Sequence, residues 1–246
     1  MDYIIIPARM ESKRLPGKPL LKETGKYLVQ HTWEQCKKSK LAHDVIIAVD
    51  DLEVQKICHS FGAKAIMTSK FCRNGSERCA EVCQWLIEPK YIINVQCEYP
   101  TISPRMLDQL FADQSIEGPV QTVTTLSYKT INKADYFSNS NVKVVVDNSQ
   151  HALYFSRSPI PYQEPFKRAN IHVGVYGYEV SFIEELYSCL TQSSIYTRME
   201  NLEQLDWLAL GIPIKVQGIR GAITGIDTQE EYARFVHRYT SPSQSD

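Results

Sequence analysis

The chain has 246 residues, of which 43% are hydrophobic and 22% charged, and these values exclude a disordered or fibrous protein. Its 27 basic and 28 acidic residues give a net charge of −1, which argues against nucleic acid as a partner. Seven cysteines without a C-x-x-C pair favour reduced thiols. Since no signal-peptide pattern and no long apolar stretch occurs, we expect a cytoplasmic protein with no membrane insertion.

Short apolar, β-branched runs alternate with amphipathic segments in the first hundred residues. Strands are predicted at residues 3–6, 45–49, 63–67 and 91–95. Helices are predicted between them, at residues 29–41, 52–61 and 76–86. Strands that alternate with helices imply a parallel sheet with helices on both faces. Ligands of such folds bind beyond the carboxyl ends of the strands.

The second half of the chain is richer in β-strands. Strands are predicted at residues 120–128, 142–146, 152–155, 171–178 and 212–216. Helices are predicted at residues 182–190, 201–210 and 229–236. We therefore expect one α/β domain over residues 1–239, with a mostly parallel central sheet and a smaller β-rich lobe. Residues 240–246 have the composition of a disordered tail.

A dense basic loop directly follows the first strand. Residues 9–18 contain four basic side chains and one acidic side chain. The prolines and the glycine of residues 16–19 stiffen the loop, so that its cations lose little entropy when they bind a polyphosphate. The loop has one glycine and no G-K-[ST], so it is not a P-loop. A solvated basic loop without a ligand is the alternative that the residues alone leave open.

The loop and seven further motifs resemble the 3-deoxy-manno-octulosonate (Kdo) cytidylyltransferases, which activate an acidic sugar for lipopolysaccharide synthesis. The loop itself is similar to the family pattern P-A-R-x-x-S-x-R-L-P-G-K-P-L. The other similar segments are AVDD (48–51), MTS with NGSER (67–69, 74–78), NVQCEYP (94–100), FSRSPIPY (155–162), HVGVY (172–176), ENLEQL (200–205) and GIDT (225–228). The matches follow the family's order over nearly the whole chain.

This resemblance implies a Rossmann-like nucleotidyltransferase fold and the transfer of CMP from CTP to an acidic sugar, most closely Kdo, with release of pyrophosphate. Mg²⁺ would assist the attack of the sugar's anomeric hydroxyl on the α-phosphate. The carboxylates of Glu98 and Asp227 would hold this ion. Arg9 and Lys18 would stabilise the charge of the reacting phosphates. The nucleotide-binding residues implied by the family are Pro7, Ala8, Arg9, Ser12, Arg14, Lys18, Ser69, Gly75, Ser76 and Arg78.

The family also implies a sugar site and a homodimer. The implied sugar-binding residues are Gln96, Arg157, His172, Tyr176, Glu203 and Gln204. Arg157 would hold the sugar carboxylate, because a guanidinium offers two parallel donors. Simpler interpretations remain for several of these residues. Asp227 can be a helix N-cap, Asn74–Gly75 a turn, His172 a structural histidine, and Glu203 with Gln204 a solvent-facing pair.

The chain departs from the family where the family pattern reads N-V-Q-G-D-E-P. Here Gly, Asp and Glu become Cys97, Glu98 and Tyr99. Glu98 keeps a carboxylate but adds a methylene, Cys97 adds a Cβ, and Tyr99 removes an acid. Three consequences are possible: an active divergent enzyme, a preference for another acidic sugar, or a homologue that binds without catalysis. Asp206, where the family has a basic residue, is a further change that can alter sugar contacts.

Overall fold

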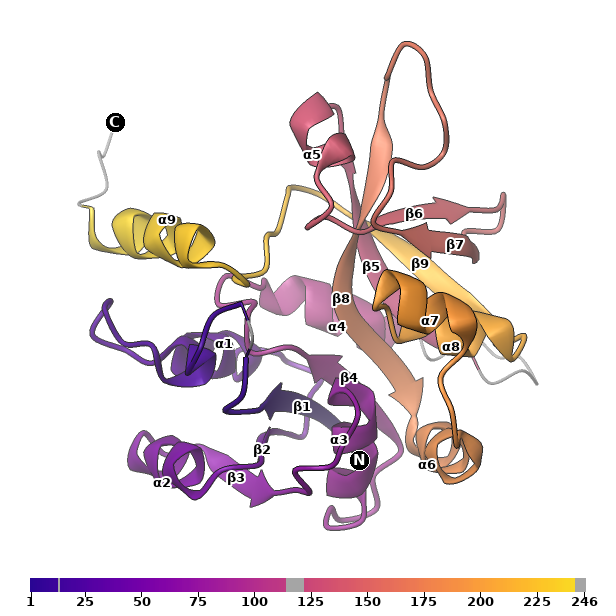
Figure 1. Cartoon of the computed structure of the whole chain (residues 1–246). Helices are drawn as coiled ribbons and strands as arrows, with labels where there is room; N and C mark the ends of the chain where they lie inside the picture. Colours follow the sequence, from indigo (N-terminus) through magenta and orange to yellow (C-terminus); the bar gives the residue numbers. More distant parts are fainter. Residues whose placement is uncertain (13, 114–121, 242–246) are drawn as a thin grey trace.

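The computed structural model describes residues 1–12, 14–113 and 122–241, which form a nine-stranded sheet and surrounding helices (Figure 1). The strands are β1 (Asp2–Ala8), β2 (Asp44–Val49), β3 (Lys64–Met67), β4 (Tyr91–Val95), β5 (Val123–Thr130), β6 (Lys143–Val146), β7 (Ala152–Ser156), β8 (Ala169–Glu179) and β9 (Ile214–Ile219). The main order is β3-β2-β1-β4-β8-β5-β9, and within this order β8 alone runs antiparallel to its neighbours. The α/β class and the mostly parallel sheet are thus confirmed.

The smaller lobe is the antiparallel pair β6–β7, joined to the main sheet through a pairing of β6 with β8 and a bridge between His151 and Lys215 of β9. The helices of the described residues are α1 (Leu28–Cys36), α2 (Leu52–Ser60), α3 (Gly75–Cys83), α4 (Pro104–Asp113), α5 (Lys133–Phe137), α6 (Val180–Cys189), α7 (Ile195–Glu200), α8 (Gln204–Ala209) and α9 (Gln229–Thr240). A short 3-10 helix, η1, spans Lys18–Leu20.

Alternate residues of the central strands pack into two cores on opposite faces of the sheet. Ile4 and Ile6 of β1 belong to a core that α1, α2 and α4 cover. Tyr3 and Ile5 of the same strand belong to the other core, which α3, α6 and α8 cover. Since both faces of the strands are buried, their sequences are apolar throughout instead of alternating. The prediction of helices on both faces is confirmed.

Several predicted boundaries were wrong. The helix predicted at 29–41 ends at Cys36, because the Asp108 carboxylate accepts hydrogen bonds from Ser39 Oγ (2.5 Å) and Lys40 N (3.0 Å) and draws the chain away. The helix predicted at 201–210 is the shorter α8, and α7, which directly precedes it, was not predicted; Asn201, in the left-handed conformation (φ 54°), ends α7. Helices α4 and α5 were not predicted, and residues 120 and 121 of the predicted strand lie outside the described residues.

The C-terminal helix α9 packs beside α1 (Figure 1). Tyr232 of α9 and Leu28 of α1 are buried in one small cluster, and His31 of α1 contacts the ring of Phe235 edge-on at 5.2 Å. Helix α9 continues through Thr240, so the predicted tail began too early, and residues 242–246 lie outside the described residues. In the described part of the chain, no helix is both long and apolar enough to cross a membrane.

Candidate active site

The basic loop leaves the carboxyl end of β1 and returns at Lys18 through a tight turn. Gly17 adopts φ 65°, a left-handed conformation that favours glycine, and η1 starts at the next residue. Leu15, just before the turn, is buried, and its carbonyl accepts a hydrogen bond from Lys18 N at 3.2 Å. The turn therefore directs Lys18 inwards while Arg9 and Arg14 remain exposed.

Lys18 lies between the two predicted metal ligands. Its Nζ donates to Glu98 Oε2 at 2.6 Å and to Asp227 Oδ1 at 2.9 Å. The second oxygen of Asp227 pairs with Arg14 at 3.0 Å. The side chain of Lys18 is 11% exposed and those of Glu98 and Asp227 are 19% and 31% exposed, so this cluster is shielded but reachable from solvent. The fold thus joins residues from three distant parts of the sequence.

The charges of this cluster control one another. Burial tends to lower the pKa of Lys18, but the carboxylates of Glu98 and Asp227 outweigh burial and raise it, so Lys18 is a fixed cation. Burial raises the pKa of Glu98 in spite of Lys18. Asp227 is less buried, and the charges of Lys18 and Arg14 overcome burial and lower its pKa. The cluster therefore presents fixed positive charge together with carboxylate oxygens.

Backbone contacts hold the two carboxylates in place. Ile226 N donates to Glu98 O at 2.9 Å, which ties the segment before α9 to the end of β4. Glu231 accepts from Asp227 N (2.8 Å) and Thr228 N (2.9 Å), and Thr228 caps the helix in return. This capping box fixes the backbone of Asp227, which itself precedes the N-cap and keeps its carboxylate free for Lys18 and Arg14.

Asp50, at the carboxyl end of β2, links the basic loop to the next loops. Its Oδ1 accepts from Met10 N at 2.9 Å, and its Oδ2 pairs with Arg78 at 3.0 Å. Arg78 is 3% exposed and also donates to Thr68 Oγ1 and to Ser69 O. Arg78 was predicted at the nucleotide, and the structure places it beneath the loops that follow β2 and β3. Asp50 was absent from the predicted site, although it belongs to the AVDD motif.

The start of α3 and the end of β4 form a polar wall. Asn74 caps α3 through Glu77 N. Asn94 donates to Ser76 Oγ at 3.1 Å and accepts from Gln96 Nε2 at 2.9 Å. A Cβ on Gly75 would lie 2.6 Å from Gln96 Nε2, so glycine is needed here for the Gln96 side chain to approach the backbone. Gln96, Ser76 and Gly75 are thus neighbours, as a shared site requires.

Arg157 follows β7 in the smaller lobe, and its guanidinium is held at two points. Its Nε donates to Glu200 O at 2.8 Å and Nη1 to Asn139 O at 3.1 Å, while its backbone N donates to Glu200 Oε2 at 2.9 Å. Burial and the charge of Arg14 lower the pKa of Arg157, and Asp227 opposes this shift. The charges of Arg14 and Asp227 thus act on the Arg157 guanidinium, while its hydrogen bonds go to Glu200 and Asn139.

The other predicted sugar residues are largely buried. Burial lowers the pKa of His172 to about 3, and its Nε2 lies 3.0 Å from Thr125 Oγ1, so the ring stays neutral. Tyr176 is 3% exposed and donates to Gln204 Oε1 at 3.0 Å. Among the described residues, Glu203 Oε2 and Gln204 Nε2 are buried without a hydrogen-bond partner. Gln204 therefore does not face solvent and Glu203 is partly buried, so the two do not form a solvent-facing pair.

Two of the three departures from the family pattern, Cys97 and Tyr99, are buried, and Glu98 is partly buried. Cys97 O accepts from Thr32 Oγ1 at 2.8 Å, and burial raises the pKa of the Cys97 thiol to about 12. The Tyr99 hydroxyl accepts from Gly174 N at 2.9 Å. Glu98 alone of the three reaches the charged cluster. Cys97 and Tyr99 thus pack beneath the site. The sequence marked Tyr99 only as a lost acid and did not single out Asp50, and both are positioning residues.

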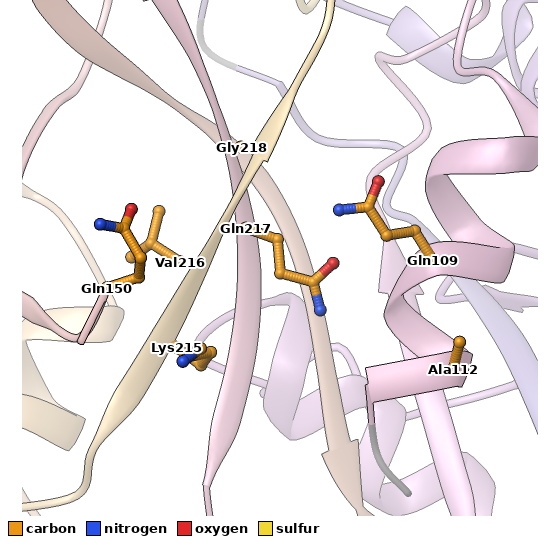
Figure 2. A pocket seen from close by; sticks show the side chains of 7 residues that line it. All are labelled: Gln109, Ala112, Gln150, Lys215, Val216, Gln217 and Gly218. Atoms are coloured by element: carbon orange, nitrogen blue, oxygen red, sulfur yellow. The ribbon is translucent and has the colours of Figure 1, made fainter. Parts of the chain in front are cut away.

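The open pocket of Figure 2 lies elsewhere, between α4 and β9. Its lining residues are Gln109, Ala112, Gln150, Lys215, Val216, Gln217 and Gly218. It includes none of the predicted site residues.

Comparison with known proteins agrees with this geometry. The Cytidylyltransferase family profile matches residues 3–215. The 3-deoxy-manno-octulosonate cytidylyltransferase of Fusobacterium nucleatum is 40% identical over 237 residues, covering 95% of this chain and 94% of that protein. The enzyme of the same name from Escherichia coli is 39% identical over 227 residues, covering 92% and 90%.

A solved structure described as CMP:2-keto-3-deoxy-manno-octonic acid synthetase complexed with CTP has a TM-score of 0.87 and 37% identity. The alignment covers 96% of this chain and 97% of that structure. A putative glucose-1-phosphate thymidylyltransferase from Bacillus anthracis, at 14% identity and a TM-score of 0.66, shares the fold. The chain therefore belongs to the 3-deoxy-manno-octulosonate cytidylyltransferase family of nucleotidyltransferase enzymes.

Proposed function

We propose that this enzyme transfers CMP from CTP to 3-deoxy-manno-octulosonate. The anomeric hydroxyl oxygen forms a bond to the α-phosphorus, the bond from that phosphorus to the bridging β-phosphate oxygen breaks, and pyrophosphate leaves. The hydroxyl proton passes to solvent, since no dedicated base is assigned. The convergence of Lys18, Glu98 and Asp227 beside the basic loop is the observation that carries the proposal, because phosphoryl transfer depends on fixed charge at the reacting phosphates.

The basic loop supplies the triphosphate site in this proposal. Arg9 and Arg14 are exposed and Lys18 is fixed, so three cations can approach a chain of phosphates from one loop. Ser12 and the backbone of Pro7 and Ala8 complete the loop's contribution. The loops after β3 and β4, with Ser69, Gly75, Ser76 and the buried Arg78, shape the rest of the nucleotide site, as the family resemblance implies.

Glu98 and Asp227 fit a magnesium ion. Their oxygens reach the same ammonium at 2.6 and 2.9 Å, so both point to one place that a cation already favours. Mg²⁺ prefers a few carboxylate oxygens completed by substrate oxygens and water. When bound, the ion supplies positive charge that neutralises the phosphate oxygens. Glu98 and Asp227 would hold it, and Lys18 and Arg14 would orient those carboxylates.

The sugar site lies on the lobe side of the same cluster. Arg157 binds the sugar carboxylate, because its guanidinium is fixed at Nε and Nη1 and Nη2 has no partner among the described residues. Gln96, Glu203 and Gln204 would bind hydroxyl groups of the sugar, as the family resemblance implies. His172 and Tyr176, which are buried against each other at 5.5 Å between ring centres, shape this wall.

A substrate panel tests the proposal. Pyrophosphate release is measured with CTP and Mg²⁺ and with Kdo, a sialic acid, or an amino-substituted octulosonate. Turnover that is fastest with Kdo is expected. Faster turnover with another acidic sugar would replace Kdo as the proposed substrate and leave the proposed type of reaction unchanged. Binding of CTP by calorimetry without pyrophosphate release from any sugar would instead make the protein a non-catalytic homologue.

The proposal includes a homodimer in the cytoplasm, where nucleoside triphosphates are available. Exposed hydrophobic side chains on the lobe and α7 support an interface: Leu153 is 60%, Tyr162 86% and Met199 76% exposed. Sedimentation velocity should show a dimer that Met199→Glu converts to monomer, whereas Phe71→Glu, at an exposed site in another loop, leaves it intact. A wild-type monomer at micromolar concentration would contradict this interface.

A further inference from the structure

Lys143 of β6 is a buried cation that the predicted site does not include. It is 0% exposed, and its Nζ donates to Ser138 O (2.9 Å), Asn141 O (2.8 Å) and Arg157 O. These three carbonyl oxygens use all three of its N–H donors. No carboxylate among the described residues forms an ion pair with it. Burial, with a smaller contribution from Arg157, lowers its pKa to about 8.

Lys143 contacts both the backbone of Arg157 and the loop that accepts a hydrogen bond from the Arg157 guanidinium. One contact is the carbonyl oxygen of Arg157 itself. The other two are carbonyls of Ser138 and Asn141, which flank Asn139 in the loop after α5. The carbonyl oxygen of Asn139 accepts from Arg157 Nη1 at 3.1 Å. Lys143 therefore fixes both the backbone of Arg157 and the loop that holds its guanidinium.

Stability alone is a poor reason to bury a cation here. Removing an ammonium from water is costly, and apolar residues of similar volume usually stabilise a core at least as well. The cost is higher beside a second cation, Arg157, and the negative charge of Glu200 offsets part of it for both residues. A charged group that joins three carbonyls from two segments does, however, specify one arrangement of those segments.

We infer that Lys143 is a positioning residue that orients the Arg157 guanidinium to receive the sugar carboxylate. The inference rests on the proposed function, in which Arg157 binds that carboxylate. Lys143 itself does not touch the sugar, and its contribution passes through the backbone and the Asn139 carbonyl. Its loss is therefore expected to weaken binding of the acidic sugar while binding of CTP is unchanged.

The test is a double-mutant cycle of Lys143→Met and Arg157→Met, in which KM is measured separately for Kdo and for CTP. Each single variant should raise the KM for Kdo about tenfold or more, the factor expected for one charge-assisted hydrogen bond. The double variant should match Arg157→Met alone, because the two residues act as one unit. Lys143→Gln keeps two donors and should show a smaller increase. Lys129→Met, at an exposed position of β5, is the control.

Additive effects in the cycle, or an equal rise in the KM for CTP, would overturn the role of Lys143. If Arg157→Met raises the KM for Kdo and neither Lys143 variant does, the inference fails and the proposed function stands. If Arg157→Met has no effect on Kdo, the assignment of Arg157 in the proposed function fails as well. Thermal unfolding and CTP binding are measured for each variant. A variant that unfolds early and no longer binds CTP has lost its fold.

Discussion

Tyr99 stands where the family has an acid, and its hydroxyl completes an irregular part of the sheet. The pairing of β5 with β8 shifts between Thr125 and Leu126, which leaves Gly174 and Val175 without partners on β5. The Tyr99 hydroxyl accepts from Gly174 N at 2.9 Å, and Thr125 Oγ1 donates to Val175 O at 2.8 Å. Both backbone groups exposed by the bulge are therefore satisfied by side chains.

Tyr99→Phe should lower the melting temperature, because the partly buried Gly174 N–H loses its acceptor. A buried donor without a partner costs about 1–3 kcal/mol. For a chain of this size each kcal/mol corresponds to roughly 2–4 °C. Calorimetry on the variant checks this, with Tyr239→Phe, at a tyrosine that is 49% exposed, as the control. Equal melting temperatures for the two variants would show that the Tyr99 hydroxyl does not stabilise the fold.

Glu203 should make stability depend on pH. Burial raises the pKa of this carboxyl from 4.5 to about 7, so between these values the folded chain binds more protons than the unfolded chain. Its contribution is favourable below pH 4.5 and is lost as the pH rises through 7. Glu203→Gln should therefore melt a few degrees higher than wild type at pH 8, by roughly 2–4 °C per kcal/mol, and show no gain at pH 4.5.

Melting curves over this pH range measure the effect of Glu203→Gln. Glu185→Gln, at an exposed position of α6, is the matched control and should follow the wild type. A gain in melting temperature that is the same at every pH would contradict an origin in the titration of Glu203.

At the scale of elements, α9 determines where Asp227 lies. The reciprocal capping box between Thr228 and Glu231 fixes the first turn of the helix, and Glu231 also accepts from Asp227 N. Tyr232, in the same turn, donates to Glu23 and anchors the helix on the segment that follows η1. The helix start thus holds a carboxylate of the site opposite the basic loop.

Thr228→Ala should destabilise the protein by about 1 kcal/mol, the usual contribution of an N-cap hydroxyl. It should also reduce kcat several-fold, because Asp227 loses its fixed backbone. Chemical denaturation and steady-state rates measure both effects. Thr240→Ala makes the same change at the exposed end of α9 and should alter neither. A stability loss without any change in kcat would show that the cap does not position Asp227.

Element types were predictable wherever apolar periodicity is strong, as in β1, β2, β4 and α2. Helix α4 also carries such a signal, with Pro104 at its start and Leu107, Leu110 and Phe111 on one face, and it was overlooked. The division between α7 and α8 depends on the left-handed backbone of Asn201, which periodicity does not reveal. The sequence motifs indicated Glu98 and Asp227. These residues lie 80 and 209 positions after Lys18 in the sequence, so only the fold shows that both contact it.

At the scale of the whole molecule, the two cores share the same strands. Ile4 and Ile6 of β1 face one core, and Tyr3 and Ile5 face the other. Neither core can therefore open without disrupting strands that the other needs. The proposed single domain over residues 1–239 follows from this sharing.

Unfolding should accordingly be one cooperative transition. Far-ultraviolet circular dichroism reports the whole sheet, while tryptophan fluorescence reports Trp33, Trp85 and Trp207, of which Trp207 of α8 is fully buried in one of the two cores. We expect coincident denaturant midpoints from the two probes. Comparison with a Trp207→Phe variant isolates the contribution of that tryptophan. Two separated transitions would indicate that the smaller lobe unfolds independently.

The charged cluster joins loops from β1, β4 and the start of α9, and the central claim is that its altered acid, Glu98, supports catalysis. The most direct test measures CMP-sugar and pyrophosphate formed from CTP, Mg²⁺ and Kdo by the wild type and by Glu98→Gln. The account predicts equal amounts of both products from the wild type. It also predicts that Glu98→Gln lowers kcat by about 100-fold or more while it still binds CTP in calorimetry. A wild-type protein that binds CTP but forms product no faster than Glu98→Gln would contradict it.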